Sequence, residues 1–158
     1  MSEVTCVDRQ PAAVVGPAIR TKIASGETVL LQVTGRSMTP LFHDRRDAVL
    51  LVGVTVWPPK PGDILFAQRA DESYVLHRVI RIVGDGCIFN GDGQLWIEGP
   101  IPRNQVIAQV QAFRRKGKFY PVTHPLYRAY VRIWMGLRPI RRRLFALGRF
   151  AKRLCGKK

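Results

Sequence analysis

The sequence predicts a mainly β, antiparallel domain followed by a basic amphipathic helix at the C-terminus. Between residues 25 and 123, short apolar runs are separated by turns rich in Gly and Pro, and no helical segments alternate with them, which is typical of antiparallel β domains. From residue 124 onward, apolar residues recur at helical spacing instead. We therefore divide the chain into an N-terminal arm (1–24), a β domain (25–123) and a basic tail (124–158).

The arm is expected to be irregular with a short helix near residues 14–22, because Pro11, Gly16 and Pro17 interrupt it. The proline-rich segment 57–63 must be a surface connection, and residues 114–118 suit a basic hairpin turn. Strands are expected, in chain order, at residues 28–34, 48–52, 64–67, 74–83, 87–90 and 106–113.

Charge is distributed unequally along the 158 residues, whose formal net charge is +15. Residues 1–98 hold 10 basic and 11 acidic residues, whereas residues 99–158 hold 16 basic residues and no acidic one. The C-terminal part should therefore attract an anionic partner.

The basic tail has three interpretations: a helix packed on its own domain, a helix lying on an anionic membrane surface, or a nucleic-acid patch. Aromatic residues beside the aliphatic stripe favour the membrane over nucleic acid, and Pro139 should kink or divide the helix. The residues expected at the membrane are Arg132, Trp134, Arg138, Arg142, Arg143, Phe145, Arg149 and Phe150.

Cysteines are few and scattered. Cys6, Cys87 and Cys155 are odd in number and widely spaced, so neither a disulfide framework nor a zinc site is indicated, and no cofactor is expected. The N-terminus does not resemble a secretory signal, and no stretch of about 18 uncharged apolar residues suggests a membrane span. We expect a cytoplasmic protein that contacts the inner membrane face peripherally.

Ser37 is the candidate nucleophile. It follows the strand at residues 28–34 and lies between Gly35 and Pro40, which favour a rigid, exposed turn. A serine needs a base, and His77 is the one histidine expected within a strand, on the face that also carries two valines. Asp92, between two glycines, is a candidate to orient the imidazole, although Gly-Asp-Gly is also a common turn.

At these positions the chain resembles the signal peptidase I superfamily of serine proteases, which includes the self-cleaving LexA-type repressors. Residues 35–40 (GRSMTP) are similar to the nucleophile box of that family. Residues 60–65 (KPGDIL), 75–79 (VLHRV) and 89–93 (FNGDG) resemble, in the same order, its Gly-Asp strand, its base strand and its later Gly-Asp turn. The resemblance covers roughly residues 28–113.

The resemblance implies a signal-peptidase-like β fold and a serine endopeptidase. Histidine at the base position resembles the archaeal, endoplasmic-reticulum and spore-former branch, which works with Ser, His and Asp, whereas bacterial members commonly have lysine there. The oxyanion and substrate groove would be formed by Gly35, Arg36, Met38 and Pro40. The implied substrate is an extended peptide or protein precursor with small residues before the cut, such as a cytoplasmic leader, docked as an added strand.

Two departures from the family leave alternatives open. Signal peptidases of this kind carry a membrane anchor, which the sequence lacks, and many have a hydroxyl residue at the position of Gly35 to help bind the oxyanion. The alternative function is therefore a catalytically weak or inactive module that binds peptide or membrane on the same fold. LexA-like self-cleavage is a third, less favoured possibility, because no DNA-binding domain precedes the fold, although residues 24–26 offer small side chains.

Overall fold

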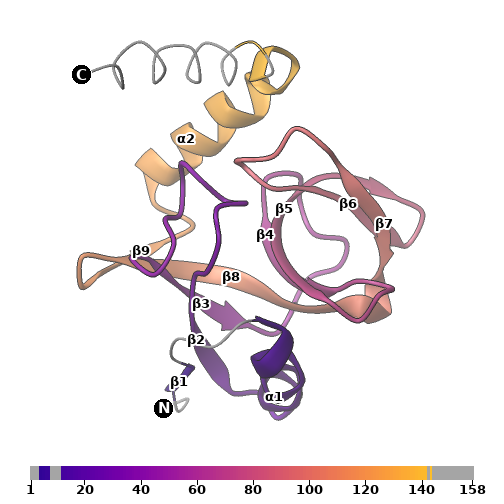
Figure 1. Cartoon of the computed structure of the whole chain (residues 1–158), viewed down its shortest axis with the longest axis vertical. Coiled ribbons are helices and arrows are strands. Elements are labelled where there is room, and N and C mark those ends of the chain that lie inside the picture. The colour runs from indigo at the N-terminus through magenta and orange to yellow at the C-terminus, as the bar shows by residue number, and fades with distance from the viewer. Residues whose placement is uncertain (1–3, 8–11, 142, 144–158) are drawn as a thin grey trace, which may run out of the picture.

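The fold is built on one curved sheet that all nine described strands share (Figure 1). The computed structural model describes residues 4–7, 12–141 and 143. The strand order is β1-β2-β3-β8-β4-β5-β6-β7, with β9 paired to β8. The β1–β2 pair is parallel and the other pairs are antiparallel, so the mainly β, antiparallel architecture is confirmed. The strands are β1 (Val4–Val7), β2 (Thr28–Gln32), β3 (Ala48–Val52), β4 (Ile64–Gln68), β5 (Tyr74–Val83), β6 (Gly86–Asn90), β7 (Glu98–Pro102), β8 (Val106–Arg115) and β9 (Lys118–Pro121).

The six expected strands correspond to β2, β3, β4, β5, β6 and β8, and the sequence missed the other three. β7 has the sequence EGPIP, and its two prolines argue against a strand in a local reading. In the structure, β7 is the last strand in the sheet order and pairs only with β6. A proline, which has no N–H to donate to a neighbouring strand, therefore costs little stability here. The basic hairpin turn expected at residues 114–118 joins β8 to β9.

The N-terminal arm contains a longer helix than expected, α1 (Ala12–Ala24). Its side chains Val15, Ile19 and Ile23 recur every four residues and are buried against the sheet. Gly16 lets the helix approach β5 closely, since a Cβ there would lie 2.3 Å from the ring of Tyr74. Tertiary packing therefore stabilises a helix that the local Gly-Pro pair disfavours.

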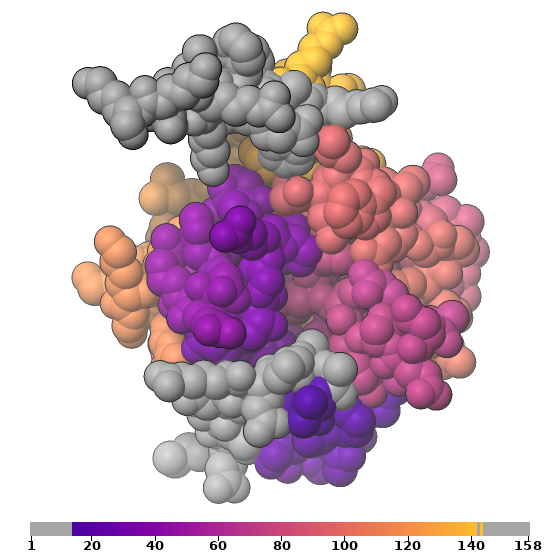
Figure 2. All heavy atoms as spheres, viewed as in Figure 1, coloured from indigo at the N-terminus to yellow at the C-terminus, as the bar shows by residue number. Residues whose placement is uncertain are grey.

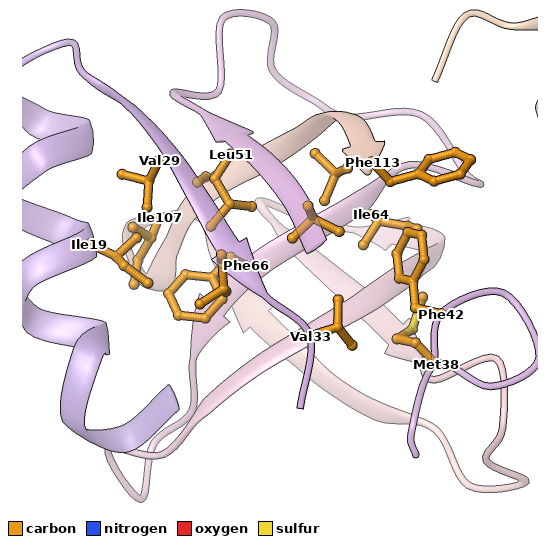
Figure 3. Close-up of a cluster of buried hydrophobic side chains, with 14 of the residues drawn as sticks. Ile19, Val29, Val33, Met38, Phe42, Leu51, Ile64, Phe66, Ile107 and Phe113 are labelled. Atoms are coloured by element: carbon orange, nitrogen blue, oxygen red, sulfur yellow. The ribbon is translucent and has the colours of Figure 1, made fainter. Parts of the chain in front are cut away.

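The larger core cluster extends from α1 to the loop that carries Ser37 (Figure 3). Ile19 lies at one end of it and Met38 and Phe42 at the other, with Phe66 of β4 between them. Phe42 also packs on Phe113 of β8, with ring centroids 5.5 Å apart. This loop (residues 33–47, between β2 and β3), which we call the nucleophile loop after the candidate role of Ser37, is thus anchored in the core by its own apolar side chains. One core contains residues of all three predicted segments, because Tyr127 of the tail belongs to it.

A second, smaller cluster lies within the curl of β4, β5, β6 and β7. It contains Val75 and Val79 of β5 together with Phe89 of β6. His77 lies between these two valines on the same face of β5, as the sequence predicted.

The tail begins with helix α2 (Pro125–Gly136), which is followed by a 3₁₀ turn at Arg138–Ile140. His124 caps the helix, because its Nδ1 accepts a hydrogen bond from the N–H of Leu126 at 3.3 Å. The helix ends shortly before Pro139, where a break was predicted. Residues 144–158 lie outside the described residues. Within the described chain, no helix has the length and apolar character needed to cross a bilayer.

We predict that Phe66→Ala lowers the free energy of unfolding by about 3–5 kcal/mol, because it removes a fully buried ring and leaves a cavity. Phe119→Ala is the control: that side chain is 51% exposed, so its loss should change the free energy by about 0.5 kcal/mol or less. Urea unfolding followed by circular dichroism measures both values. Equal losses in the two variants would contradict this assignment of the core.

Candidate active site

A cavity of about 230 Å³ lies between the end of β2 and the beginning of β5. Its lining includes Leu31–Thr34 on one side and Tyr74–His77 on the other, and Ser37 and His77 both contribute to it. In Figure 2 this region is hollowed between the purple segment, which contains the nucleophile loop, and the pink segment, which leads into β5. The structure thus brings the two candidate catalytic residues to one pocket.

Ser37 is held in its turn by contacts on both sides. Gly35 has φ of +83°, a conformation that side chains other than glycine adopt only with strain, and its N–H donates to Asp44 Oδ1 at 2.8 Å. On the other side of Ser37, Met38 is buried in the core. The hydroxyl residue that many signal peptidases have two positions before the serine would therefore be strained here.

His77 is 2% exposed and comes from β5, directly across the pocket from the nucleophile turn. Its Nδ1 is enclosed and lies 3.3 Å from Glu98 Oε1 without forming a hydrogen bond, so the contact is electrostatic. No hydrogen bond links Ser37 to His77 in the structure. Catalytic hydrogen bonds are often long in an unliganded enzyme, so this geometry is compatible with a nucleophile and base.

The carboxylate beside His77 belongs to Glu98, which the sequence analysis did not identify. Arg69 fixes it by donating two hydrogen bonds of 2.8 Å, and Ser73 Oγ in turn accepts one from Arg69 at 3.1 Å. Glu98 begins β7, the proline-containing strand that the sequence did not predict, so no local pattern pointed to it.

Asp92, the predicted orienting acid, is instead engaged by other groups. Arg78 donates to both of its oxygens, at 2.8 and 2.6 Å, and the hydroxyl of Tyr130 donates to Oδ2 at 3.2 Å. Arg78 is the residue after His77 and lies on the opposite face of β5, where Asp92 also lies. The carboxylate of Asp92 therefore contacts Arg78 and Tyr130, and the acid that contacts the imidazole of His77 is Glu98, so the orienting role expected for Asp92 stays a prediction.

Electrostatics keep the imidazole of His77 neutral near pH 7. Burial lowers its pKa below the usual value of 6.5, Glu98 and Asp92 raise it, Arg69 lowers it, and the net shift is downward. For Glu98, burial raises the pKa, but Arg69 and the histidine outweigh that effect, so the carboxyl is ionised. A neutral imidazole beside a fixed carboxylate is the state that a general base requires.

The other predicted groove residues are only partly brought together. Met38 lines the cavity, whereas Gly35, Arg36 and Pro40 are exposed on the loop and do not line it. The backbone N–H of Ser37 donates to no acceptor in the described part of the chain. That N–H is therefore available to an incoming oxyanion.

The tail residues assigned to a membrane divide into separate groups. Arg132 and Arg143 are exposed, whereas Trp134 and Arg138 are half-buried. Trp134 stacks on Tyr130 at 5.8 Å and lies under the guanidinium of Arg141, so its ring contacts two other residues of the tail, and its membrane role stays a prediction. Arg142, Phe145, Arg149 and Phe150 lie outside the described residues.

Metal ligands do not converge anywhere in residues 4–7, 12–141 and 143, where no three His, Cys, Asp or Glu side chains are placed to hold an ion. Cys87 is buried in the second cluster, where burial and then Asp85 raise the pKa of its thiol to about 11. It is therefore protonated and inert at neutral pH.

We predict that His77 titrates below pH 6.5 in a nuclear magnetic resonance titration. Glu98→Gln should lower its pKa further, because the variant removes an attractive negative charge and leaves Arg69 in place. The depressed pKa also makes stability fall as the pH drops from 6.5 toward the folded-state pKa, because the unfolded chain binds the proton first. A higher pKa in Glu98→Gln would contradict the assigned contact.

Comparison with known proteins gives no independent assignment. No protein-family model matches the sequence, and no curated protein matches it either. The family resemblance therefore depends on the four short motifs and on the site that they form.

Proposed function

We propose that the chain is a serine endopeptidase of the signal peptidase type, on a signal-peptidase-like β domain, with Ser37 as nucleophile and His77 as general base. The observation that carries the proposal is the meeting of Ser37 and His77 in one pocket, with Glu98 on the far side of the imidazole. Four ordered motifs along the chain support the same family.

In the proposed reaction, the Oγ of Ser37 attacks a peptide carbonyl while the imidazole of His77 takes its proton. The ring then returns the proton to the leaving amine. In the second step the imidazole takes a proton from water, the water attacks the acyl carbonyl, and the acyl group leaves as Ser37 Oγ regains its proton. Glu98 stabilises the imidazolium that forms, and Arg69 keeps the carboxylate ionised and in place. The free N–H of Ser37 supplies one oxyanion donor.

The strands that flank the pocket suit an extended substrate. β5 pairs with β4 over Tyr74–Arg78 and meets β6 only from Arg78 onward, so its other edge is unpaired before that residue within the described chain. On β2, the pairing with β1 ends at Leu31 among the residues that the structure describes. Both unpaired edges line the cavity, and a peptide could pair with them as an added strand. We propose a cytoplasmic leader or peptide precursor with small residues before the cut.

We predict that Ser37→Ala and His77→Ala each lower kcat/KM by about 10⁴-fold or more, because the nucleophile and base act as a unit. Wild-type activity should rise with pH through the depressed pKa of His77 and reach its plateau by about pH 7. Mass spectrometry of a diverse peptide mixture measures cleavage. Cleavage that persists in Ser37→Ala would contradict the mechanism, and binding without cleavage by folded wild type would favour the inactive peptide-binding module.

We also propose an anionic membrane surface as a partner of the tail. Supporting this, Arg128, Arg132 and Arg143 are exposed, and residues 99–158 contain no acid to repel anionic lipid. Leu126 and Ile133, 76% and 63% exposed, place apolar groups on the outer side of α2.

We predict that the protein cosediments with vesicles containing phosphatidylserine and that Arg128→Glu with Arg132→Glu weakens binding by roughly 10-fold or more, since each arginine near such a surface contributes about 1 kcal/mol. Added salt should weaken wild-type binding. There are two controls. Vesicles of phosphatidylcholine alone test the need for anionic lipid, and Arg81→Glu tests a charge reversal at an exposed position on β5, away from the tail. Equal binding to both vesicle types would contradict an electrostatic contact.

A further inference from the structure

The turn at residues 91–93 lies directly against the backbone of the nucleophile loop. The N–H of Gly93 donates to the carbonyl oxygen of Ser37 at 2.8 Å. A Cβ on Gly91 would come within 2.5 Å of that same oxygen, and one on Gly93 within 2.7 Å of the carbonyl oxygen of Arg36. The two backbones are therefore in contact without intervening side chains, and a displacement of the turn must displace Ser37.

Helix α2 in its turn holds residues 91–93 in position. Asp92 is fully buried and accepts hydrogen bonds from Arg78 and from the hydroxyl of Tyr130, which is the only one of these donors located on the helix. Burial and then the nearby carboxylate raise the pKa of Tyr130, so its hydroxyl remains protonated and able to donate. A charged acceptor makes such a bond stronger than a neutral one.

A second contact ties the segment after α2 to the same region. Arg141 is 3% exposed, and its guanidinium donates to Asn90 Oδ1 at 3.0 Å and to the carbonyl of Trp134 at 3.1 Å. Asn90 ends β6, immediately before the turn, and its side-chain amide donates to the carbonyls of Gln94 and Trp96. The helical segment is thus attached to the turn at Asp92 through Tyr130 and, two residues earlier, at Asn90 through Arg141.

We propose that α2 is part of the apparatus that positions the nucleophile, and that Tyr130 is a positioning residue for Ser37 acting through Asp92 and Gly93. The inference rests on the proposed peptidase function for its kinetic consequence. Its structural consequence, the ordering of the Gly93–Ser37 contact, does not depend on catalysis.

The test compares Tyr130→Phe with Tyr120→Phe. Both variants remove one hydroxyl from a half-buried tyrosine, but Tyr120 stacks on Phe113 and its hydroxyl makes no hydrogen bond among the described residues. One readout is the rate of covalent labelling of Ser37 by a fluorophosphonate probe, with kcat and KM for a cleaved peptide. The other is hydrogen–deuterium exchange of the Gly93 amide, and thermal unfolding verifies that both variants are folded.

We expect Tyr130→Phe to slow labelling and lower kcat by roughly 3- to 30-fold with KM changed less than about twofold, because the nucleophile is misplaced while the groove is intact. Exchange at Gly93 should accelerate in the same variant, and Tyr120→Phe should match wild type in every readout. Unchanged Gly93 exchange and unchanged labelling in folded Tyr130→Phe would overturn the inference. If even wild type is not labelled, the proposed peptidase function fails, and the exchange rates alone then decide the positioning role of Tyr130.

Discussion

The buried ion pair between Arg78 and Asp92 connects most parts of this fold. Both side chains are essentially without solvent contact, and the guanidinium also donates to the carbonyl of Gly62 at 2.7 Å and reaches the hydroxyl of Tyr127 at 3.4 Å. Strand β5, the loop before β4, the turn after β6 and helix α2 therefore converge on one pair of charges. Removing either partner would leave the other charged and buried, a loss of about 3–5 kcal/mol in comparable cases.

Strand β5 carries this ion pair on one face and the proposed base on the other. Because side chains alternate along a strand, His77 and Arg78 point to opposite sides of the sheet although they are adjacent in the chain. His77 lies beside the small cluster and Arg78 toward α2. One strand thus supplies both the proposed base and the anchor of the turn that contacts the loop of Ser37, which couples the geometry of the proposed site to the stability of the domain.

The environment of His77 balances two opposing effects. Burial depresses the pKa of the imidazole, and the carboxylate of Glu98 offsets part of that depression. Arg69 opposes this offset: it binds Glu98, and its positive charge repels an imidazolium and so lowers the pKa of His77. The net result is an imidazole that is neutral at pH 7, with a carboxylate beside it that stabilises the cation formed when it accepts a proton.

The sequence by itself determined the β architecture, the six internal strands, the turn that carries Ser37 and the face of β5 on which His77 lies. These features depend on local periodicity and on turn residues, which act over a few positions of the chain. Only the tertiary structure decided that Glu98 rather than Asp92 contacts the imidazole, and that Trp134 packs on Tyr130 and Arg141. The reason is physical. Glu98 of β7 and His77 of β5 meet because β6 pairs with both strands, and the inner face of α2 is the one that covers the buried charges. A local sequence pattern encodes neither arrangement.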